Sequence, residues 1–554
     1  MLKKSWVLMG AGMWQLLAAA QTLPNAGAQL QQLPPAPVRS APGPQLQVTR
    51  EASGSGVRVD AKTFTAQRLV LEGASAYAPH ELLQMAGFTP GQPMNLQILY
   101  GMAERITRRY RADGYLVAQA YIPAQDVSDG VVKIVVLEGN YGRVVVRNTT
   151  SIRPELVSDV LAVLNAGDPI QQQPLETRLL ELSDLPGVQI QSKLQPGAAW
   201  GTSDLWLDVT PAAAVSGSVD ADNAGSRYTG IDRLGGTLNV NNPTGSADQV
   251  SLRALSSGAG LNYFRGAYLR PIGSWRMGLA YSELRYALGQ EFASLQAHGS
   301  ARMVSLWGTH AMVRSLAYNQ YLSLALDHKL LSDHQDQVAL DTDKAVDVLT
   351  LTLHGDQRDP WAGGGLTRFS VGAAWGAVNI QTPDVWRTDA STAHTQGNFN
   401  KLNVSVSRQQ ALTSTVSLLG SASGQTASKN LNASEKMQLG GMYGVRAYPE
   451  GEAYADMGYF LSLELRKRLR SAPTQASVVH LIAFVDAGQV KLNRHPWSEG
   501  NNQRQLSGMG VGVNWDASND LVVKAFYAVK LGTDPAQSAP DRSGRFWVQT
   551  VKFF

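Results

Sequence analysis

One arginine and one aspartate in the second half of the chain are placed where a buried ion pair could form. Arg446 lies in a long connection, roughly Gly440 to Gly458, that has no apolar face. Asp486 lies in a stretch whose alternation turns it, with His480 and Phe484, away from the apolar side. A guanidinium can donate two parallel hydrogen bonds to a carboxylate, so this pair would hold the connection against the strand. A solvated loop arginine is the alternative interpretation.

Residue patterns typical of catalysis or metal binding are missing from the sequence. It has no His-Glu-x-x-His pair, no Gly-x-Ser-x-Gly elbow and no phosphate-binding loop, and its nine histidines show no metal-ligand spacing. The run Gly508 to Gly512 has the look of a dinucleotide loop, but its glycines share one face of a strand, which favours small residues facing a lumen. We therefore expect no catalytic residue, no cofactor and no metal.

Strands that alternate apolar and polar side chains follow one another from about Val215 to Phe554. In Tyr459 to Arg468, for example, the leucines at 461, 463 and 465 lie on one face, with serine, glutamate and arginine on the other. A period of two suits a wall between hydrocarbon and water, and in hydrocarbon such a sheet must close because an open edge would leave backbone groups unpaired. The pattern predicts a transmembrane antiparallel β-barrel of about 16 strands over residues 213–554. A large soluble β protein is the alternative.

The N-terminal residues are typical of an export signal. Lys3 and Lys4 form a basic start, Trp6 to Ala20 an apolar core, and Ala26-Gly27-Ala28 a small-residue cleavage site before Gln29. Residues 1–28 are therefore the predicted signal peptide. Residues 29–63 are predicted to be a Pro-rich linker, because five prolines between positions 34 and 44 exclude a continuous helix there.

A degenerate repeat lies between the linker and the barrel. The order strand, helix, helix, strand, strand occurs in residues 64–140 and again in 141–212. Each copy predicts a helix pair that covers one face of a small three-stranded α+β sheet. Such a sheet has free edges, to which an unfolded protein could add a strand through main-chain hydrogen bonds.

The composition limits the compartment and the partners. The sequence has no cysteine, which fits passage through an oxidising periplasm. The net charge of +4 includes the two lysines of the signal peptide, so the sequence gives no reason to expect nucleic-acid binding.

Two motifs then point to a known family. Gly444-Val445-Arg446-Ala447-Tyr448 resembles its Val-Arg-Gly-Tyr/Phe loop motif, and Phe484-Val485-Asp486-Ala487-Gly488 resembles its Phe-x-Asp-x-Gly strand motif. Residues 222–225 and 241–245 are similar to its first barrel hairpin. With two POTRA-like repeats before the strands, the chain resembles the outer-membrane transporters of two-partner secretion (TpsB, haemolysin-activator type) over nearly everything after residue 60. One departure is Ala447, where the family usually has glycine.

The resemblance implies a function and a set of partners. POTRA domains in the periplasm would recognise the N-terminal secretion domain of a large exoprotein, which would cross the outer-membrane barrel unfolded. The exoprotein would be a haemolysin, an adhesin or a contact-dependent toxin. Other partners would be outer-membrane lipid and the barrel-assembly machinery that inserts the chain, with the C-terminal aromatic Phe554 as assembly signal. Arg446 and Asp486 would form what we call the loop–barrel latch.

The family usually has an N-terminal helix that plugs the pore. The prolines between positions 34 and 44 argue against such a helix in that segment, so we expect extended chain or no plug. Two other functions stay open on the residues alone. A barrel-assembly factor usually carries three or more repeats, whereas a passive porin needs none.

Overall fold

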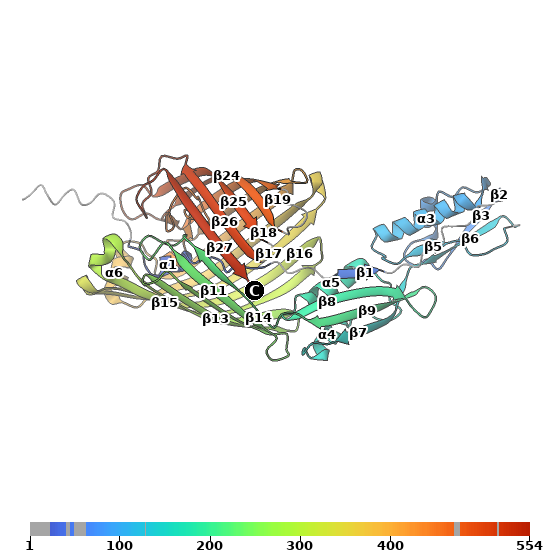
Figure 1. The fold of residues 1–554 in the computed structure, drawn as a ribbon, viewed down its shortest axis with the longest axis horizontal. Coiled ribbons are helices and arrows are strands. Elements are labelled where there is room, and N and C mark those ends of the chain that lie inside the picture. The colour runs from blue at the N-terminus through green and yellow to red at the C-terminus, as the bar shows by residue number, and fades with distance from the viewer. Residues whose placement is uncertain (1–22, 40–44, 49–62, 128, 470–476, 518–519) are drawn as a thin grey trace, which may run out of the picture.

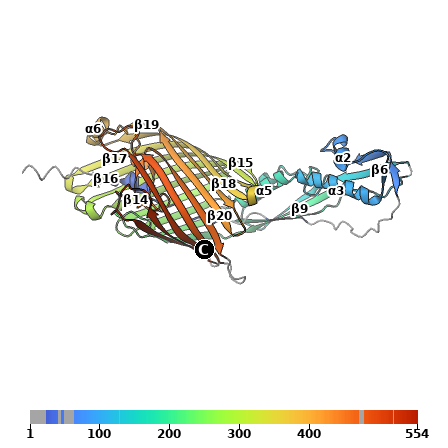
Figure 2. The ribbon, with the colours of Figure 1, turned by 90° about the horizontal axis from the view of Figure 1, so that it is seen from above.

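The computed structural model describes residues 23–39, 45–48, 63–127, 129–469, 477–517 and 520–554. A large β-barrel and two small α+β domains make up most of this part of the chain. The two small domains follow one another away from one end of the barrel (Figures 1 and 2). The predicted signal peptide lies outside the described residues up to residue 22.

Within the described residues, we find no helix with the length and apolar character needed to cross a bilayer.

The barrel is a closed sheet of 16 strands in which sequence neighbours pair antiparallel, as predicted. Its strands are β10 (Val215–Asp222), β11 (Arg233–Asn241), β12 (Gln249–Ser256), β13 (Leu261–Ile272), β14 (Trp275–Ala287), β15 (Ala297–Arg314), β16 (Tyr318–Gln335), β17 (Leu340–Asp359), β18 (Gly365–Ile380), β19 (Gly397–Ala411), β20 (Val416–Ala427), β23 (Met457–Leu469), β24 (Val478–Lys491), β25 (Gln503–Asp516), β26 (Leu521–Lys530) and β27 (Gly544–Phe553).

The predicted alternation decides which side chains face outward. In β23, Leu461, Leu463 and Leu465 are all about half exposed on the outer wall, whereas Glu464 is buried inside. In β24, Leu481 and Val485 are exposed on the outer wall, whereas Asp486 faces the lumen and is buried. An apolar outside and a polar inside are what a lipid-embedded, water-filled barrel requires.

The first and last strands close the barrel. β10 pairs with β27 from Ser218 opposite Phe553 to Asp222 opposite Gln549. Beyond this ladder, Phe554 and Gly217 exchange two backbone hydrogen bonds, of 3.0 and 3.1 Å. A Cβ on Gly217 would lie 2.6 Å from the Phe554 ring, so the glycine leaves room for the terminal aromatic.

The first small domain consists of a three-stranded sheet in the order β3-β6-β5 and two helices. Its elements are β2 (Phe64–Ala66), β3 (Arg68–Glu72), α2 (Pro79–Ala86), β4 (Gln92–Met94), α3 (Leu96–Ala112), β5 (Gln119–Tyr121) and β6 (Val131–Leu137), with β2 and β4 paired separately. Apolar residues of α3 such as Leu99, Met102 and Ile106 pack on the sheet and form the core.

The second small domain repeats this plan with one addition. Its elements are β7 (Asn140–Asn148), α4 (Pro154–Leu161), α5 (Gln172–Ser183), β8 (Val188–Pro196) and β9 (Thr202–Pro211). A further strand, β1 (Gln45–Val48), comes from the N-terminal segment and gives the order β1-β8-β9-β7. The residues predicted to be only a linker therefore contain a strand. The prolines at 42 and 44 precede it and do not interrupt its ladder.

The second domain is fixed to the end of the barrel that faces the two small domains, which we call the near end; the opposite end is the far end. Asp184, at the end of α5, accepts two hydrogen bonds from Arg314 of β15, of 3.0 and 2.9 Å. Nearby, Thr177 of α5 donates to the backbone oxygen of Arg314 at 2.8 Å. These contacts hold this domain beside the turns at that end of the barrel.

The connections at the far end of the barrel carry the remaining short elements, among them α6, which Figure 1 shows opposite the small domains. They are η1 (Gln290–Leu295), α6 (Pro383–Ser391), η4 (Ala433–Glu435), β21 (Met437–Gln438), β22 (Tyr454–Ala455) and η2 (Asp336–Val338), whereas η3 (Trp361–Gly363) lies at the near end. The longest connection, residues 428–456 between β20 and β23, folds into the lumen, and we call it the inward loop.

Candidate functional site: the contents of the barrel lumen

Arg446 of the inward loop and Asp486 of β24 form a bidentate ion pair in the lumen. The arginine Nε donates to Oδ2 at 2.8 Å, and Nη2 donates to Oδ1 at 2.7 Å. The backbone N–H of Arg446 also donates to Oδ2, at 3.2 Å. Arg446 is 5% exposed and Asp486 is 0% exposed, so water screens this pair very little. The structure thus brings together the two residues on which the sequence argument depends.

A second carboxylate completes the surroundings of the guanidinium. Arg446 Nη1 donates to Glu464 Oε1 of β23 at 2.7 Å, and Nη2 donates to the hydroxyl of Ser462 at 3.2 Å. Ser462 in turn donates to Asp486 at 2.8 Å. The alternation of β23 turns Ser462 and Glu464 toward the lumen, but the pairing of Glu464 with Arg446 was not predicted from the sequence.

The ring of Phe484, in the strand motif, packs face-on against the guanidinium of Arg446. The Arg446 Cζ is 3.5 Å from the centre of the Phe484 ring and 5.2 Å from the centre of the Phe526 ring. A cation over an aromatic face is attracted by the ring quadrupole, and more so where water is excluded. The two ion pairs and the ring together fix the position of the loop tip.

Glycines let the loop approach the strands closely. A Cβ on Gly488 of β24 would lie 2.4 Å from Leu439 Cδ1 of the loop, and within the loop a Cβ on Gly444 would lie 2.1 Å from the Leu439 oxygen. The Ala447 methyl lies against Gly508 of β25, where an added Cβ would be 2.4 Å from it. The absence of a side chain at position 508 therefore explains how alanine is accommodated where the family usually has glycine.

The remaining residues of the loop motif are also buried. Val445 donates a backbone hydrogen bond to the Leu439 oxygen at 2.8 Å. The Tyr448 hydroxyl donates to the Asp534 oxygen at 2.9 Å, and Lys530 Nζ lies 4.6 Å from the centre of its ring. Trp547 of β27 donates its indole N–H to the Arg446 oxygen at 2.7 Å. No sequence signal pointed to Trp547, because it lies far along the chain.

Further charged groups hold the base of the inward loop. Glu452 pairs with Arg504 of β25 at 2.9 Å and accepts hydrogen bonds from the backbone N–H groups of residues 537 and 538. Glu435 pairs with Lys401 of β19 at 2.8 Å and with Lys329 of β16. These pairs were not anticipated from the sequence, since each joins segments that are distant along the chain.

A short helix, α1 (Ala26–Gln31), lies in the lumen beside the inward loop. Asn25 caps its start, accepting a 3.0 Å hydrogen bond from the Ala28 N–H. Ala26 donates its backbone N–H to Asp333 of β16 at 2.7 Å. A Cβ on Gly27 would lie 2.7 Å from the Ser434 nitrogen, so this contact with the loop needs glycine. Figure 1 shows α1 within the barrel.

This helix corrects the prediction that extended chain or no plug would occupy the pore. The prolines do exclude a helix between positions 34 and 44, but α1 ends before them. It was overlooked because Ala26-Gly27-Ala28 is also typical of a cleavage site. Cleavage before Gln29 would remove the first half of α1, so a processed chain keeps this helix only if cleavage falls before Asn25.

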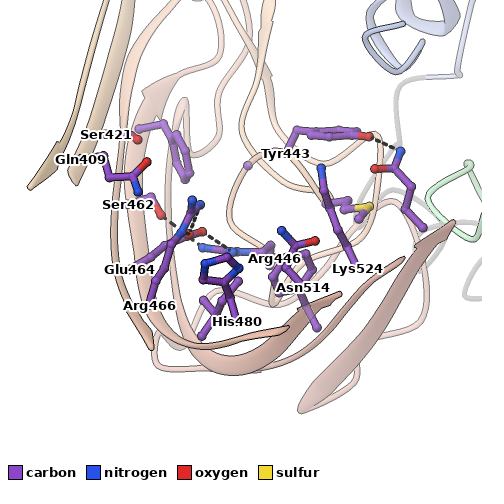
Figure 3. A pocket seen from close by; sticks show the side chains of 16 residues that line it. Gln409, Ser421, Tyr443, Arg446, Ser462, Glu464, Arg466, His480, Asn514 and Lys524 are labelled. Atoms are coloured by element: carbon purple, nitrogen blue, oxygen red, sulfur yellow. Dashed lines mark hydrogen bonds and ion pairs between the residues drawn. The ribbon is translucent and has the colours of Figure 1, made fainter. Parts of the chain in front are cut away.

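A cavity of about 500 Å³ lies beside the latch, lined by polar and charged side chains together with Met442, Phe460, Ile482 and Phe526 (Figure 3). Figure 3 shows Glu464 and Arg466 close to Arg446, with Tyr443 on another side of the cavity, bonded to Gln549. Among the described residues there is no group of histidine and carboxylate side chains that could hold a metal ion. The arrangement suits a water-filled passage partly closed by protein segments.

The fold and the lumen together define a class of protein, an outer-membrane β-barrel with POTRA domains and an inward-folded loop. Residues 201–515 match the family described as haemolysin secretion/activation protein ShlB/FhaC/HecB, and residues 64–139 match the POTRA domain of ShlB type. The first match covers more than half of the chain, which therefore belongs to this family.

Known relatives agree with this assignment. The heme/hemopexin transporter protein HuxB of Haemophilus influenzae is 28% identical over 471 residues, which cover 84% of this chain and 82% of that protein. The outer membrane transporter CdiB of Escherichia coli is 27% identical over 520 residues, covering 88% and 82%. The solved structure of CdiB from Escherichia coli has the same fold, with a TM-score of 0.69 and 22% identity over 91% of this chain and 92% of that chain.

The chain is therefore a transporter of two-partner secretion in the outer membrane, with periplasmic POTRA domains. The predicted fold class, location and general function are confirmed.

Proposed function

We propose that the chain exports one large exoprotein in unfolded form and that its POTRA domains capture the N-terminal secretion domain of this partner. The observation that carries the proposal is a closed barrel whose lumen is partly occupied by two of its own segments, α1 and the inward loop. A folded protein would not fit beside them. An extended chain requires far less space, and removal of one segment would provide it.

The contact between the second POTRA domain and the barrel supports capture of the partner followed by its direct transfer into the pore. The Asp184–Arg314 contact holds the second POTRA domain against the barrel, so a segment bound there is already near the pore. Recognition through main-chain hydrogen bonds at a sheet edge suits a partner that arrives without a fold.

We assign the loop–barrel latch the role of holding the inward loop in place during export. Arg446 and Asp486 form the contact, and the face of the Phe484 ring packs against the guanidinium. Gly444, Val445, Ala447, Tyr448 and Gly488 shape the close approach of loop and wall. Phe554 is proposed to direct assembly, since its exposed ring lies at the strand that closes the barrel.

The partner is proposed to be a haemolysin, an adhesin or a contact-dependent toxin. No nucleotide is available outside the inner membrane, so folding of the exported chain at the cell surface would supply direction. An adjacent gene for a very large exported β-helical protein would identify the partner.

Deletion of the gene followed by comparison of the secreted and outer-membrane proteomes tests the proposal. We expect one large exoprotein to disappear from the medium while other barrels remain at normal levels. Loss of many outer-membrane barrels would instead indicate an assembly factor. Unchanged exoproteins, with solute uptake into liposomes that does not depend on residues 64–211, would indicate a passive porin.

A further inference from the structure

The outer wall of the barrel is hollowed over its first strands. Gly236 of β11 and Ala254 of β12 lie opposite each other in register, and Gly236 shares the outward face of the exposed Leu234, two residues away. The exposed side chains of Val219 and Phe264 flank the two small residues, each in register with one of them. Because these neighbouring outward positions carry only a hydrogen atom and a methyl group, the wall forms a groove of about 610 Å³.

Polar side chains line one end of this groove. Arg276, at the start of β14, donates to the Asp184 oxygen of the second POTRA domain at 3.1 Å, so β14 begins at the near end of the barrel. Its outward residues at positions 275, 277, 279 and 281 are apolar or aromatic, and the next two are Glu283 and Arg285, which line the groove with Asn262 of β13. The groove therefore crosses the boundary between hydrocarbon and headgroups in the outer leaflet.

Two arginines share one carboxylate at the polar end. Arg285 Nε donates to Glu283 Oε1 at 2.8 Å, and Nε of Arg302, the residue of β15 opposite Glu283, lies 3.7 Å from the same oxygen. The arginine side chains are 72% and 55% exposed, against 22% for the glutamate, so the positive groups are the accessible ones. One carboxylate balances one guanidinium, which leaves a surplus positive charge beside the groove.

A second groove on the outer wall has nearly the same size but a different polar end. It has a volume of about 620 Å³ and is lined by apolar side chains of β15 to β18, among them Leu326, Leu349 and Trp375. Its polar end holds His328 and Asp347, which pair at 2.6 Å, and the described residues that line it include no arginine or lysine. Of these two grooves, only the first combines an apolar hollow with surplus positive charge.

We propose that the first groove binds a phosphorylated glycolipid of the outer leaflet, with an acyl chain over Gly236 and Ala254 and a phosphate on Arg285 and Arg302. Guanidinium groups match phosphate oxygens in pairs of parallel hydrogen bonds, and a basic site beside apolar wall suits an amphiphile with an anionic head. Lipopolysaccharide has this chemistry. The bound lipid would cover the flank where β10 pairs with β27 to close the barrel. This inference goes beyond the proposed export function and does not depend on it.

Native mass spectrometry of the full chain, released from detergent, tests the proposal with diphosphoryl lipid A as the probe. We expect the unmodified chain to retain one lipid A molecule. Arg285→Gln with Arg302→Gln should weaken binding roughly tenfold or more, because the phosphate loses its charged donors. Gly236→Phe with Ala254→Phe should weaken it as much by filling the hollow. A Cβ on Gly236 would meet only the Ser218 oxygen, at 3.8 Å, so the strand accommodates this change.

The second groove supplies the matched controls. His328→Gln changes its polar end and Ala377→Phe fills its hollow, and both variants should retain lipid A as the unmodified chain does. A lipid A derivative without phosphates should bind the unmodified chain weakly, and phosphatidylethanolamine should not displace the probe. Thermal unfolding in detergent without lipid A verifies that every variant is folded.

Three results would overturn the proposal. The first is equal retention of lipid A by the unmodified chain and the arginine variant, and the second is equal binding of the phosphate-free derivative. The third is a dimer mass without bound lipid that disappears only in the variant with the filled first groove. That result would show that a second copy of the chain, and not a lipid, occupies the groove.

Discussion

The inward loop and α1 both occupy the lumen, but they are held by different kinds of contact. The loop is held by buried ion pairs, chiefly Arg446 with Asp486 and Glu452 with Arg504. Residues 23–38, which include α1, contain no charged side chain. They are held by apolar packing of Ala26 and three leucines, and by hydrogen bonds to neutral groups or to charges that have another partner. Arg233, for example, donates to the Gln32 oxygen at 2.9 Å but also pairs with Asp222 at 2.8 Å.

This difference indicates which segment leaves more easily. Withdrawal of α1 leaves Arg233 paired with Asp222, Asp333 bonded to Tyr286 and Glu435 paired with Lys401. Withdrawal of the loop would leave Asp486 and Glu464 buried without their shared cation, which is costly. We infer that α1 is the movable obstruction and that the loop is the fixed one.

The largest expected effect follows from Arg446→Ala. Loss of one partner of a buried ion pair typically costs about 3–5 kcal/mol. We expect the variant to insert into the outer membrane at normal levels, to lose thermal stability and to export the exoprotein poorly, as measured by unfolding in detergent and by exoprotein in the medium. Arg466→Ala is the control, because Arg466 lines the same cavity but, among the described residues, its side chain pairs with Glu464 alone. A normal export rate for Arg446→Ala would contradict the role of the latch.

A smaller effect is expected from Gly508→Ala. Its new methyl would lie 2.4 Å from the Ala447 methyl, and overpacking of this kind typically costs about 1–3 kcal/mol. Ala447→Gly in the same chain should restore the stability, since it removes the other methyl. Gly420→Ala is the control, because its Cβ would meet only Leu463, at 3.9 Å. Equal thermal stability of both single variants would refute the packing argument.

The pH dependence of the loop gives a third test. Burial raises the pKa of Glu450, in the inward loop, to about 7 from its usual 4.5. The pKa of Glu450 is higher in the folded chain than in the unfolded chain, so the protonated carboxyl stabilises the folded loop. This stabilisation is complete below pH 4.5 and is lost as the pH rises through 7. Between pH 4.5 and about 7 each pH unit should then cost about 1.4 kcal/mol, and above 7 the profile should level off because both states are deprotonated.

Glu450→Gln should flatten this pH profile. Charged groups near the Glu450 carboxyl, Arg233 and Asp222, already pair with one another, so they add little pH dependence in this range. The measurement is the thermal unfolding of the full chain between pH 5 and 9. Parallel profiles for the variant and the unmodified chain would show that another group titrates.

The smallest effect is expected on the side of α1. Tyr454 of the loop donates to the Ala28 oxygen at 3.1 Å and accepts from Gln32 at 2.6 Å. Tyr454→Phe removes both bonds, each of which contributes about 0.5–1.5 kcal/mol net. We expect more frequent channel openings in planar bilayers with export retained. Tyr459→Phe, on an exposed hydroxyl, is the control. If openings stay as rare as before, the helix is held by other contacts.

Much of the molecule follows from periodicity, and the exceptions have physical reasons. Alternation along β23 and β24 turns Glu464 and Asp486 to the lumen, and the loop without an apolar face supplies Arg446. Long-range partners such as Trp547 leave no local trace. Two segments were overlooked because their signals are short or ambiguous: α1 has the composition of a cleavage site, and β1 is four residues long between prolines and a Gly/Ser stretch.

The barrel wall is uneven in height. β16 and β17 have 18 and 20 residues, about twice the 9–11 that a bilayer requires, whereas β10 and β12 have only eight each. The outer rim is therefore tall on one flank and low on the other. A polypeptide emerging at the cell surface would be screened from neighbouring lipopolysaccharide on the tall flank and would spread toward the low one, so its first folded turns should form on that side.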